Sequence, residues 1–244
     1  MTADLLLLSN SRIFGMGYLE HAADAVRDVL DGRRTIHFVP YALADHDRYT
    51  ATVREALAPF GVTVLGLHTA ADPRKAVETA EVLFVGGGNS FRLLKSLQQH
   101  GLLESVRRLV VAGTLRYIGS SAGTNMACPT LRTTNDMPIV QPDSFAAFGL
   151  IPFQINPHYQ DAGPTSTHMG ETREERITEF LEENDVPVLG MREGSWLRRR
   201  GDTLRFEGRA GARLFRRRVA PEEIESGTDL SFLVGVSSRF DCPV

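Results

Sequence analysis

The chain has 244 residues, of which 42% are hydrophobic and 23% are charged. These fractions are ordinary for globular proteins and exclude a mainly disordered or fibrous chain. Its 27 Lys and Arg residues against 30 Asp and Glu residues give a net charge of −3, so no overall charge attracts nucleic acid or anionic membranes.

The two cysteines, Cys128 and Cys242, are too few for a disulfide scaffold. Cys128 stands among apolar residues, where we expect a buried and unreactive thiol. The leucine run of residues 5–8 is too short to span a membrane and lacks the basic flank of a signal peptide. We therefore expect a cytoplasmic protein.

In the first half of the chain, short apolar runs alternate with longer amphipathic segments. The short runs have the composition of buried strands and cover residues 5–8, 35–41, 62–65, 81–85 and 115–118. The segments between them place apolar residues at helical spacing and cover residues 18–30, 49–60, 73–80, 91–100 and 103–111. This alternation predicts an α/β protein of the flavodoxin-like kind, with a mostly parallel twisted sheet and helices on both faces.

The second half of the chain is less regular. Residues 130–149 show no clear period, and a stretch of that length without structure is typical of functional loops. Strands are predicted over residues 153–156, 186–191, 195–199 and 203–206, and a helix over residues 171–183. Beyond Pro221 the pattern weakens, so we expect residues 220–244 to form an irregular C-terminal extension. Because no linker divides the chain, we predict a single domain over residues 1–244.

The segment Gly119-Ser120-Ser121-Ala122-Gly123 matches the G-x-S-x-G motif. It follows a predicted strand and precedes a helix, which is the context of a nucleophile elbow. A tight turn there projects the central Ser121 from the sheet edge, and the free N–H groups of the helix N-terminus can stabilise negative charge beside it. We interpret Ser121 as the nucleophile; the alternative is an ordinary strand–helix turn.

A serine nucleophile needs a general base, and the chain has seven histidines. We expect His21, His46 and His100, on or beside predicted helices, to lie at the surface. His158 instead follows an apolar run at the carboxyl end of a predicted strand, where Ser121 is also expected. His158 is therefore the candidate base, and a purely structural loop histidine is the alternative.

The base in turn needs a carboxylate that orients its ring. Asp136 lies in the aperiodic stretch after the serine, and Glu193 follows the strand predicted over residues 186–191. Either carboxylate fits this role, and the other could bind the ammonium group of a substrate. The residues alone leave both assignments open.

The glycine-rich turn of residues 86–90 ends a predicted strand and opens a helix. Such turns can bind phosphate, but Phe91 stands where the nucleotide-binding pattern requires its third glycine. We expect the N–H of Gly88, together with the N–H of Ala122, to form an oxyanion hole, and Asn89 to contact substrate. A purely structural turn is the alternative. No metal or cofactor is expected.

Five segments in this order resemble the peptidase E family. They are VGGGNSF (85–91), GSSAG (119–123), RTTNDMPIV (132–140), QINPH (154–158) and GETRE (170–174). The resemblance implies a fold like that of class I glutamine amidotransferases and the hydrolysis of small peptides with an N-terminal aspartate. The resemblance also implies that Ser121 is the nucleophile and His158 the base, with Asp136 or Glu193 as the third member of the triad.

The same resemblance assigns Arg173 to the aspartyl side chain, which suits the bidentate pairing of guanidinium with carboxylate. The alternative is an exposed helix arginine beside Glu171 and Glu174. Family members usually carry a tryptophan before the nucleophile, where this chain has Ser120, so we expect a wider pocket here.

Two other functions remain as alternatives. One is a related serine peptidase acting on another aspartyl substrate, such as the β-aspartyl-arginine linkage of cyanophycin. The other is an amidotransferase-like binding module without catalysis; a glutaminase is disfavoured because serine replaces cysteine at the elbow. We expect no nucleic-acid or membrane partner, and the arginine runs of residues 198–200 and 216–218 are interpreted as solvated charges. Monomer and homodimer both stay open.

Overall fold

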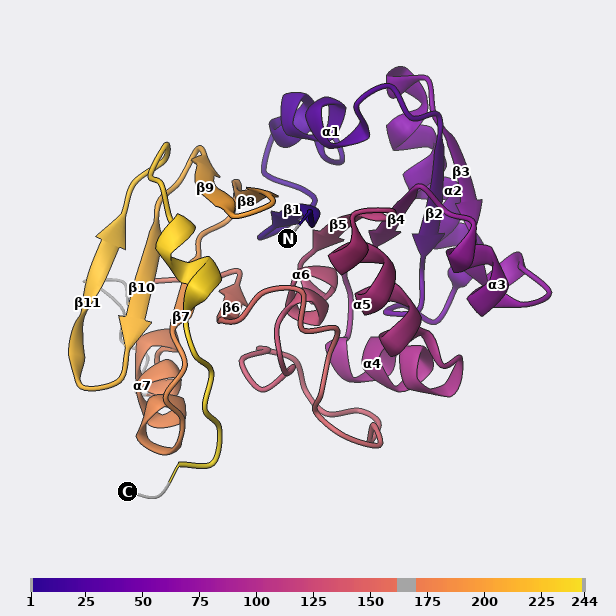
Figure 1. Cartoon of the computed structure of the whole chain (residues 1–244). Coiled ribbons are helices and arrows are strands. Elements are labelled where there is room, and N and C mark those ends of the chain that lie inside the picture. Colours follow the sequence, from indigo (N-terminus) through magenta and orange to yellow (C-terminus); the bar gives the residue numbers. More distant parts are fainter. Residues whose placement is uncertain (1, 162–169, 243–244) are drawn as a thin grey trace.

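A seven-stranded sheet forms the centre of the protein in the computed structural model, which describes residues 2–161 and 170–242. The strand order is β3-β2-β4-β5-β1-β8-β9 (Figure 1). The first five strands in that order are parallel to one another. β8 runs antiparallel to β1, and β9 runs antiparallel to β8. The strands of this sheet are β1 (Asp4–Leu8), β2 (Thr35–Val39), β3 (Thr63–Gly66), β4 (Val82–Val85), β5 (Arg116–Ser120), β8 (Ser195–Arg200) and β9 (Thr203–Gly208).

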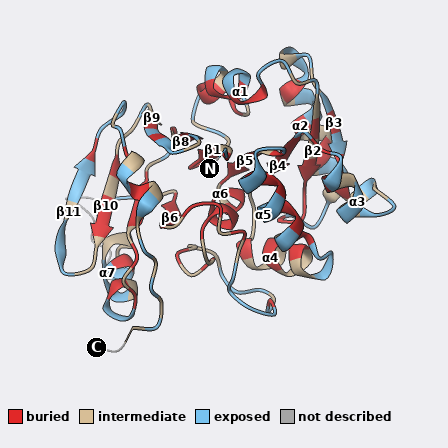
Figure 2. Ribbon diagram, in the orientation of Figure 1, coloured by how far each residue is buried: buried red, intermediate tan, exposed pale blue. Residues whose placement is uncertain are grey.

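Helices cover both faces of this sheet, because side chains along each strand alternate between two cores. Leu5 and Leu7 of β1 pack into one core, and Leu6 and Leu8 into the other. Figure 2 shows the sheet buried between its helices. The Leu6 side is covered by α1 (Ala23–Leu30) and α2 (His46–Leu57), and the Leu5 side by α3 (Pro73–Glu78), α4 (Ser90–Gln99), α5 (Leu102–Ala112) and α6 (Ala122–Ala127). The predicted sheet with helices on both faces is confirmed.

A second sheet, of four strands in the order β11-β10-β7-β6, lies beside the first and differs from the single sheet expected. β6 and β7 are parallel, and β10 is antiparallel to both β7 and β11. The elements of this part are β6 (Gln154–Pro157), β7 (Val188–Met191), β10 (Ala212–Arg216), β11 (Val219–Ile224) and the helix α7 (Arg173–Glu183). Short 3₁₀ helices occur at Glu20–Ala22, Ala58–Phe60, Leu67–Thr69 and Ser231–Gly235. None of the described helices is long and apolar enough to cross a bilayer.

The expectation of an irregular segment over residues 220–244 is wrong in its first part. β11 pairs with β10 in a hairpin, which supplies the hydrogen-bond partners that a weak hydrophobic pattern conceals. Farther along, Arg239 pairs with Asp185, and Asp241 binds Arg132 at 2.7 Å. The described end of the chain is therefore held against the body.

The expectation that residues 198–200 are solvated is wrong for Arg198 and Arg199, which are 8% and 3% exposed. β8 pairs with β1, and this pairing brings Arg198 against Asp4 and Asp28. Arg199 instead donates to the carbonyl of Leu150 at 2.7 Å. Burial of these guanidinium groups is tolerated because carboxylate and carbonyl oxygens replace water around them.

We expect Arg198→Ala to lower the free energy of unfolding by about 3 kcal/mol, because it removes a buried partner from Asp4 and Asp28. Arg200→Ala is the matched control. Arg200 binds the same Asp28, but its side chain is 59% exposed, so its loss should cost less than about 1 kcal/mol. Urea denaturation of both variants measures the difference, and equal effects would contradict the role given to burial.

Two local expectations have opposite outcomes. His21 is 7% exposed and packs near Trp196, so its surface placement is wrong. Cys128 is fully buried, and burial raises the pKa of its thiol to about 12, which makes it the unreactive thiol expected.

Candidate active site

Ser121 lies on a sharp turn between β5 and α6. Its backbone has φ +54° and ψ −113°, a strained conformation for a residue with a side chain. The flanking glycines permit the turn: a Cβ on Gly119 would lie 2.6 Å from the carbonyl oxygen of Gly123, and a Cβ on Gly123 would overlap the carbonyl oxygen of Val85. The local geometry is that of the predicted nucleophile elbow.

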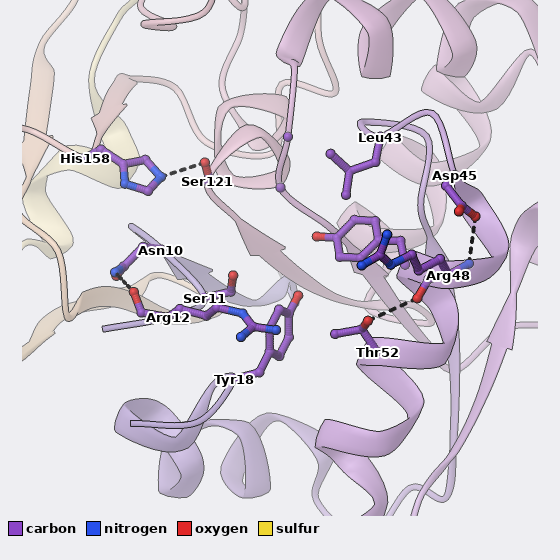
Figure 3. Close-up of a pocket in the computed structure, with 13 residues that line it drawn as sticks. Asn10, Ser11, Arg12, Tyr18, Leu43, Asp45, Arg48, Thr52, Ser121 and His158 are labelled. Atoms are coloured by element: carbon purple, nitrogen blue, oxygen red, sulfur yellow. Dashed lines mark hydrogen bonds between the residues drawn. The ribbon is translucent and has the colours of Figure 1, made fainter. Parts of the chain in front are cut away.

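A line of hydrogen bonds joins Ser121 to a carboxylate through His158. The His158 Nε2 lies 2.8 Å from the Ser121 Oγ (Figure 3). The His158 Nδ1 lies 2.7 Å from the Glu193 Oε1. The His158 side chain is 36% exposed and the Glu193 side chain 49% exposed, so the relay is open to solvent at the carboxylate end. These distances suit proton transfer from serine to imidazole.

The end of β1 holds both partners of the serine in place. The hydroxyl of buried Ser9 accepts a hydrogen bond from the backbone N–H of His158 at 3.0 Å and donates to the Met191 carbonyl at 2.9 Å. Asn10 accepts a hydrogen bond from the N–H of Gly194, next to Glu193, at 2.8 Å. Sequence reasoning missed both positioning residues, because their partners lie more than 140 positions away along the chain.

His158 follows β6, which belongs to the second sheet and not to the sheet that carries Ser121. The expectation that His158 follows a strand of the same sheet as Ser121 is therefore wrong, but His158 does lie next to Ser121 as expected. Asn125 of α6 connects the two sheets here, because its side-chain amide donates to the Ile155 carbonyl of β6 at 2.9 Å. The active site thus lies where the two sheets meet.

Asp136 is placed away from the His158 ring. Its Oδ2 accepts hydrogen bonds from the Ser90 N–H at 2.7 Å and the Ser90 Oγ at 2.6 Å, at the N-terminus of α4. A carboxylate is favourable there because of the helix dipole. Of the two carboxylates considered for the triad, the structure therefore brings Glu193 to His158 and uses Asp136 to hold the neighbouring turn.

The glycine-rich turn lies directly beside the nucleophile. A Cβ on Gly87 would lie 3.1 Å from the Ser121 Cβ, and Gly88 lines the same cavity as Ser121. Within the described residues, neither the Gly88 N–H nor the Ala122 N–H donates a hydrogen bond to a protein acceptor. Both donors fit the oxyanion role, which stays a prediction.

Asn89, expected to contact substrate, uses both ends of its side chain inside the protein. Its oxygen accepts from the Arg92 N–H at 3.0 Å and caps α4, and its amide donates to the Met137 carbonyl at 2.8 Å. These contacts give Asn89 a structural function and leave its predicted substrate contact without support.

Ser120 is not among the residues that line the cavity, and the wider pocket expected from this position stays a prediction. The residue is fully buried in β5, and its hydroxyl has no hydrogen-bond partner among the described residues. The side chain before the nucleophile therefore faces the protein interior.

Arg173 is the first residue of α7, and its side chain makes no ion pair or hydrogen bond with the described residues. Burial and the charge of Arg176 lower the pKa of Arg173, and the charge of Asp136 opposes this. The guanidinium thus lies within electrostatic reach of Asp136, outside the cavity described next.

A cavity of about 560 Å³ opens beside Ser121 and His158, within the size range of small-molecule sites. Sequence reasoning missed most of its wall, because the residues come from two loops and a helix without a recognisable motif. Besides the two catalytic candidates, the residues lining it are Asn10, Ser11, Arg12, Tyr18, Leu43, Asp45, Arg48, Tyr49, Thr52, Gly87 and Gly88.

A serine held on a strand–helix elbow against a histidine and a carboxylate, at the edge of a parallel sheet, defines a serine hydrolase site. The model of peptidase family S51 matches residues 5–206. The chain belongs to peptidase family S51.

Similar proteins cover nearly the whole chain. The protein from Streptomyces coelicolor named "Peptidase E" is 60% identical over 238 residues, which is 98% of each chain. The Drosophila melanogaster protein named "Probable alpha-aspartyl dipeptidase" is 50% identical over 95% of this chain and 97% of its own. The crystal structure of a peptidase from an acI-B1 actinobacterium has the same fold, with a TM-score of 0.67 at 16% identity over 95% of this chain and 98% of its own.

Proposed function

We propose that this chain is a serine dipeptidase that releases N-terminal aspartate from small peptides through an acyl-enzyme. The observation that carries this proposal is the unbroken line of hydrogen bonds from Glu193 through His158 to Ser121. The names of the relatives, which cover more than nine-tenths of the chain, support an α-aspartyl dipeptide as substrate.

In the proposed mechanism, the Ser121 Oγ attacks the carbonyl carbon of the aspartyl residue while His158 Nε2 takes its proton. His158 then gives that proton to the leaving amine as the peptide bond breaks. A water molecule, deprotonated by the same nitrogen, hydrolyses the ester and releases aspartate. Glu193 holds the ring with its Nδ1–H toward the carboxylate and stabilises the imidazolium.

Two further groups act on the acyl half of the substrate in this proposal. The N–H groups of Gly88 and Ala122 stabilise the oxyanion, and Arg173 pairs with the aspartyl carboxylate. Arg173 suits this role because its guanidinium has no ion pair with the described residues and is partly removed from water. Its position beyond the cavity leaves the cavity itself for the other half of the dipeptide.

The proposed partners are small aspartyl peptides, with no role for nucleic acid or membrane. Cys128 and Cys242 are both free thiols, which fits the reducing cytoplasm expected from the sequence.

The experiment that tests this function is a panel of peptides that differ in the first residue: Asp-Leu, Asn-Leu, Glu-Leu and β-Asp-Leu. We expect Asp-Leu to have the highest kcat/KM. Arg173→Ala should lower kcat/KM for Asp-Leu by about 10- to 100-fold, the value of one charge-assisted pair, and change that for Asn-Leu little.

Arg176→Ala is the matched control, because Arg176 lies one turn along the same helix and pairs with Glu171 at the surface. This variant should leave kcat/KM for all four peptides unchanged. A wild-type chain that hydrolyses the four peptides at similar rates would disprove aspartate specificity, and a preference for β-Asp-Leu would move the function to β-aspartyl linkages.

A further inference from the structure

The cavity beside Ser121 extends well beyond the catalytic residues. Its far wall is formed by the loop after β1 and by α2, with Arg12 on the first and Arg48 on the second (Figure 3). Both side chains extend from that wall into the cavity that Ser121 and His158 also line. This wall has no function in the mechanism given so far.

The cavity has an excess of positive charge. The guanidinium groups of Arg12 and Arg48 make no ion pair or hydrogen bond with any residue in the described part of the chain; Arg12 lies 5.5 Å over the Tyr18 ring. The one carboxylate in the wall, Asp45, accepts the Arg48 N–H at 2.9 Å and caps α2. Two cations therefore face one anion that is already engaged.

The other polar groups of the wall do not offset this charge. Burial raises the pKa of both Tyr18 and Tyr49, so both phenols stay neutral. Ser11 and Thr52 carry hydroxyls, and the Thr52 hydroxyl donates to the Arg48 carbonyl at 3.1 Å. A ligand in this cavity meets a wall suited to an anion.

A dipeptide brings such an anion to this place. When its scissile carbonyl is at Ser121, the free α-carboxylate of the second residue lies about one residue length farther along, since consecutive Cα atoms are about 3.8 Å apart. A longer peptide would place a neutral amide there. Guanidinium groups pair strongly with carboxylates and weakly with amides.

We propose that Arg12 and Arg48 bind the free α-carboxylate of the leaving residue and thereby restrict the enzyme to dipeptides. This proposal rests on the proposed function. It assigns the two ends of the substrate to different cations, with Arg173 on the acyl side and the Arg12–Arg48 pair on the leaving side.

The test compares Asp-Leu with Asp-Leu-amide, which lacks only the terminal charge. For the wild type we expect kcat/KM to be at least about tenfold higher for Asp-Leu. The double variant Arg12→Gln, Arg48→Gln should lose about 10- to 100-fold on Asp-Leu and keep its rate on the amide, so that the two peptides become equivalent. A merely structural role of the two arginines would lower both rates together.

Arg54→Gln is the matched control. Arg54 lies on the same helix as Arg48, but its guanidinium is directed to the Val64 carbonyl, away from the cavity. It removes one positive charge outside the cavity and should keep the preference for Asp-Leu over the amide. If Arg54→Gln lost the preference for Asp-Leu over Asp-Leu-amide as fully as the double variant does, the proposal would be overturned in favour of a general effect of net charge.

Binding to the Ser121→Ala variant, measured by calorimetry, repeats the comparison without turnover. Tighter binding of Asp-Leu than of Asp-Leu-amide, lost in the double variant, supports the carboxylate site even if hydrolysis is not observed. Equal affinities, or a double variant that weakens both peptides equally, overturn it. A wild type that binds Asp-Leu but does not hydrolyse it would instead disprove the proposed dipeptidase function.

Discussion

Replacing Ser121 by alanine is expected to lower kcat for Asp-Leu by about 10⁴- to 10⁶-fold, because the acyl-enzyme can no longer form. The hydroxyl is the only group removed, and the backbone strain at this position stays the same in the variant. The free energy of unfolding should therefore change by less than about 1 kcal/mol. Steady-state kinetics, with denaturation of the same sample, measure both quantities.

Ser120→Ala is the control for this variant, since it removes the same hydroxyl one residue earlier. That hydroxyl is fully buried and has no partner in the described part of the chain, so its removal should leave kcat unchanged and raise the free energy of unfolding by about 1 kcal/mol. A covalent serine reagent should label the wild type and Ser120→Ala but not Ser121→Ala. Residual turnover in Ser121→Ala near the wild-type rate would show that another group attacks the substrate.

The parts of the fold that depend on local signals were predictable. The strands of the parallel sheet are short apolar runs, and their order with the helices determines the α/β class. The elbow is equally local, because the glycines that Ser121 requires are its near neighbours in the chain. The same reasoning identified His158 from a strand end alone.

Features that depend on distant pairing were not predictable. The burial of Arg198 follows from the antiparallel pairing of β8 with β1, which brings it to Asp4 across 194 positions of sequence. The second sheet depends on the same kind of pairing, because β7 pairs with β6 and with β10, and other elements separate these strands in the sequence. A single sequence shows charge and period but not register.

The choice between Asp136 and Glu193 was open for the same reason. Asp136 follows the helix that begins at the serine, and Glu193 follows β7. Only the meeting of the two sheets decides which carboxylate reaches the His158 ring. Arg12 and Arg48 carried no signal at all, since an arginine in a loop and one in a first helical turn are common at any surface. Their position opposite Ser121 appears only in three dimensions.

Glu193→Gln should lower kcat by about 100-fold or more and leave KM within about threefold, because in the proposed mechanism Glu193 orients His158 and does not bind substrate. An amide at this position can donate to the Nδ1 of His158 and so place the ring proton on Nε2. That tautomer faces Ser121 with a donor and cannot accept its proton. This change of tautomer does not depend on burial, so we expect the loss of kcat even though the Glu193 side chain is half-exposed.

Asp136→Asn is the matched variant and should keep kcat within about tenfold, because an asparagine oxygen can still accept the Ser90 N–H. Loss of the charge at the α4 N-terminus should cost about 0.5–1 kcal/mol of stability instead. Measuring kcat, KM and the rate of acylation by a serine reagent separates the two carboxylates. If Asp136→Asn lost more kcat than Glu193→Gln, the hydrogen bond seen between His158 and Glu193 would not be the one that orients the base, and the triad would have to rearrange when substrate binds.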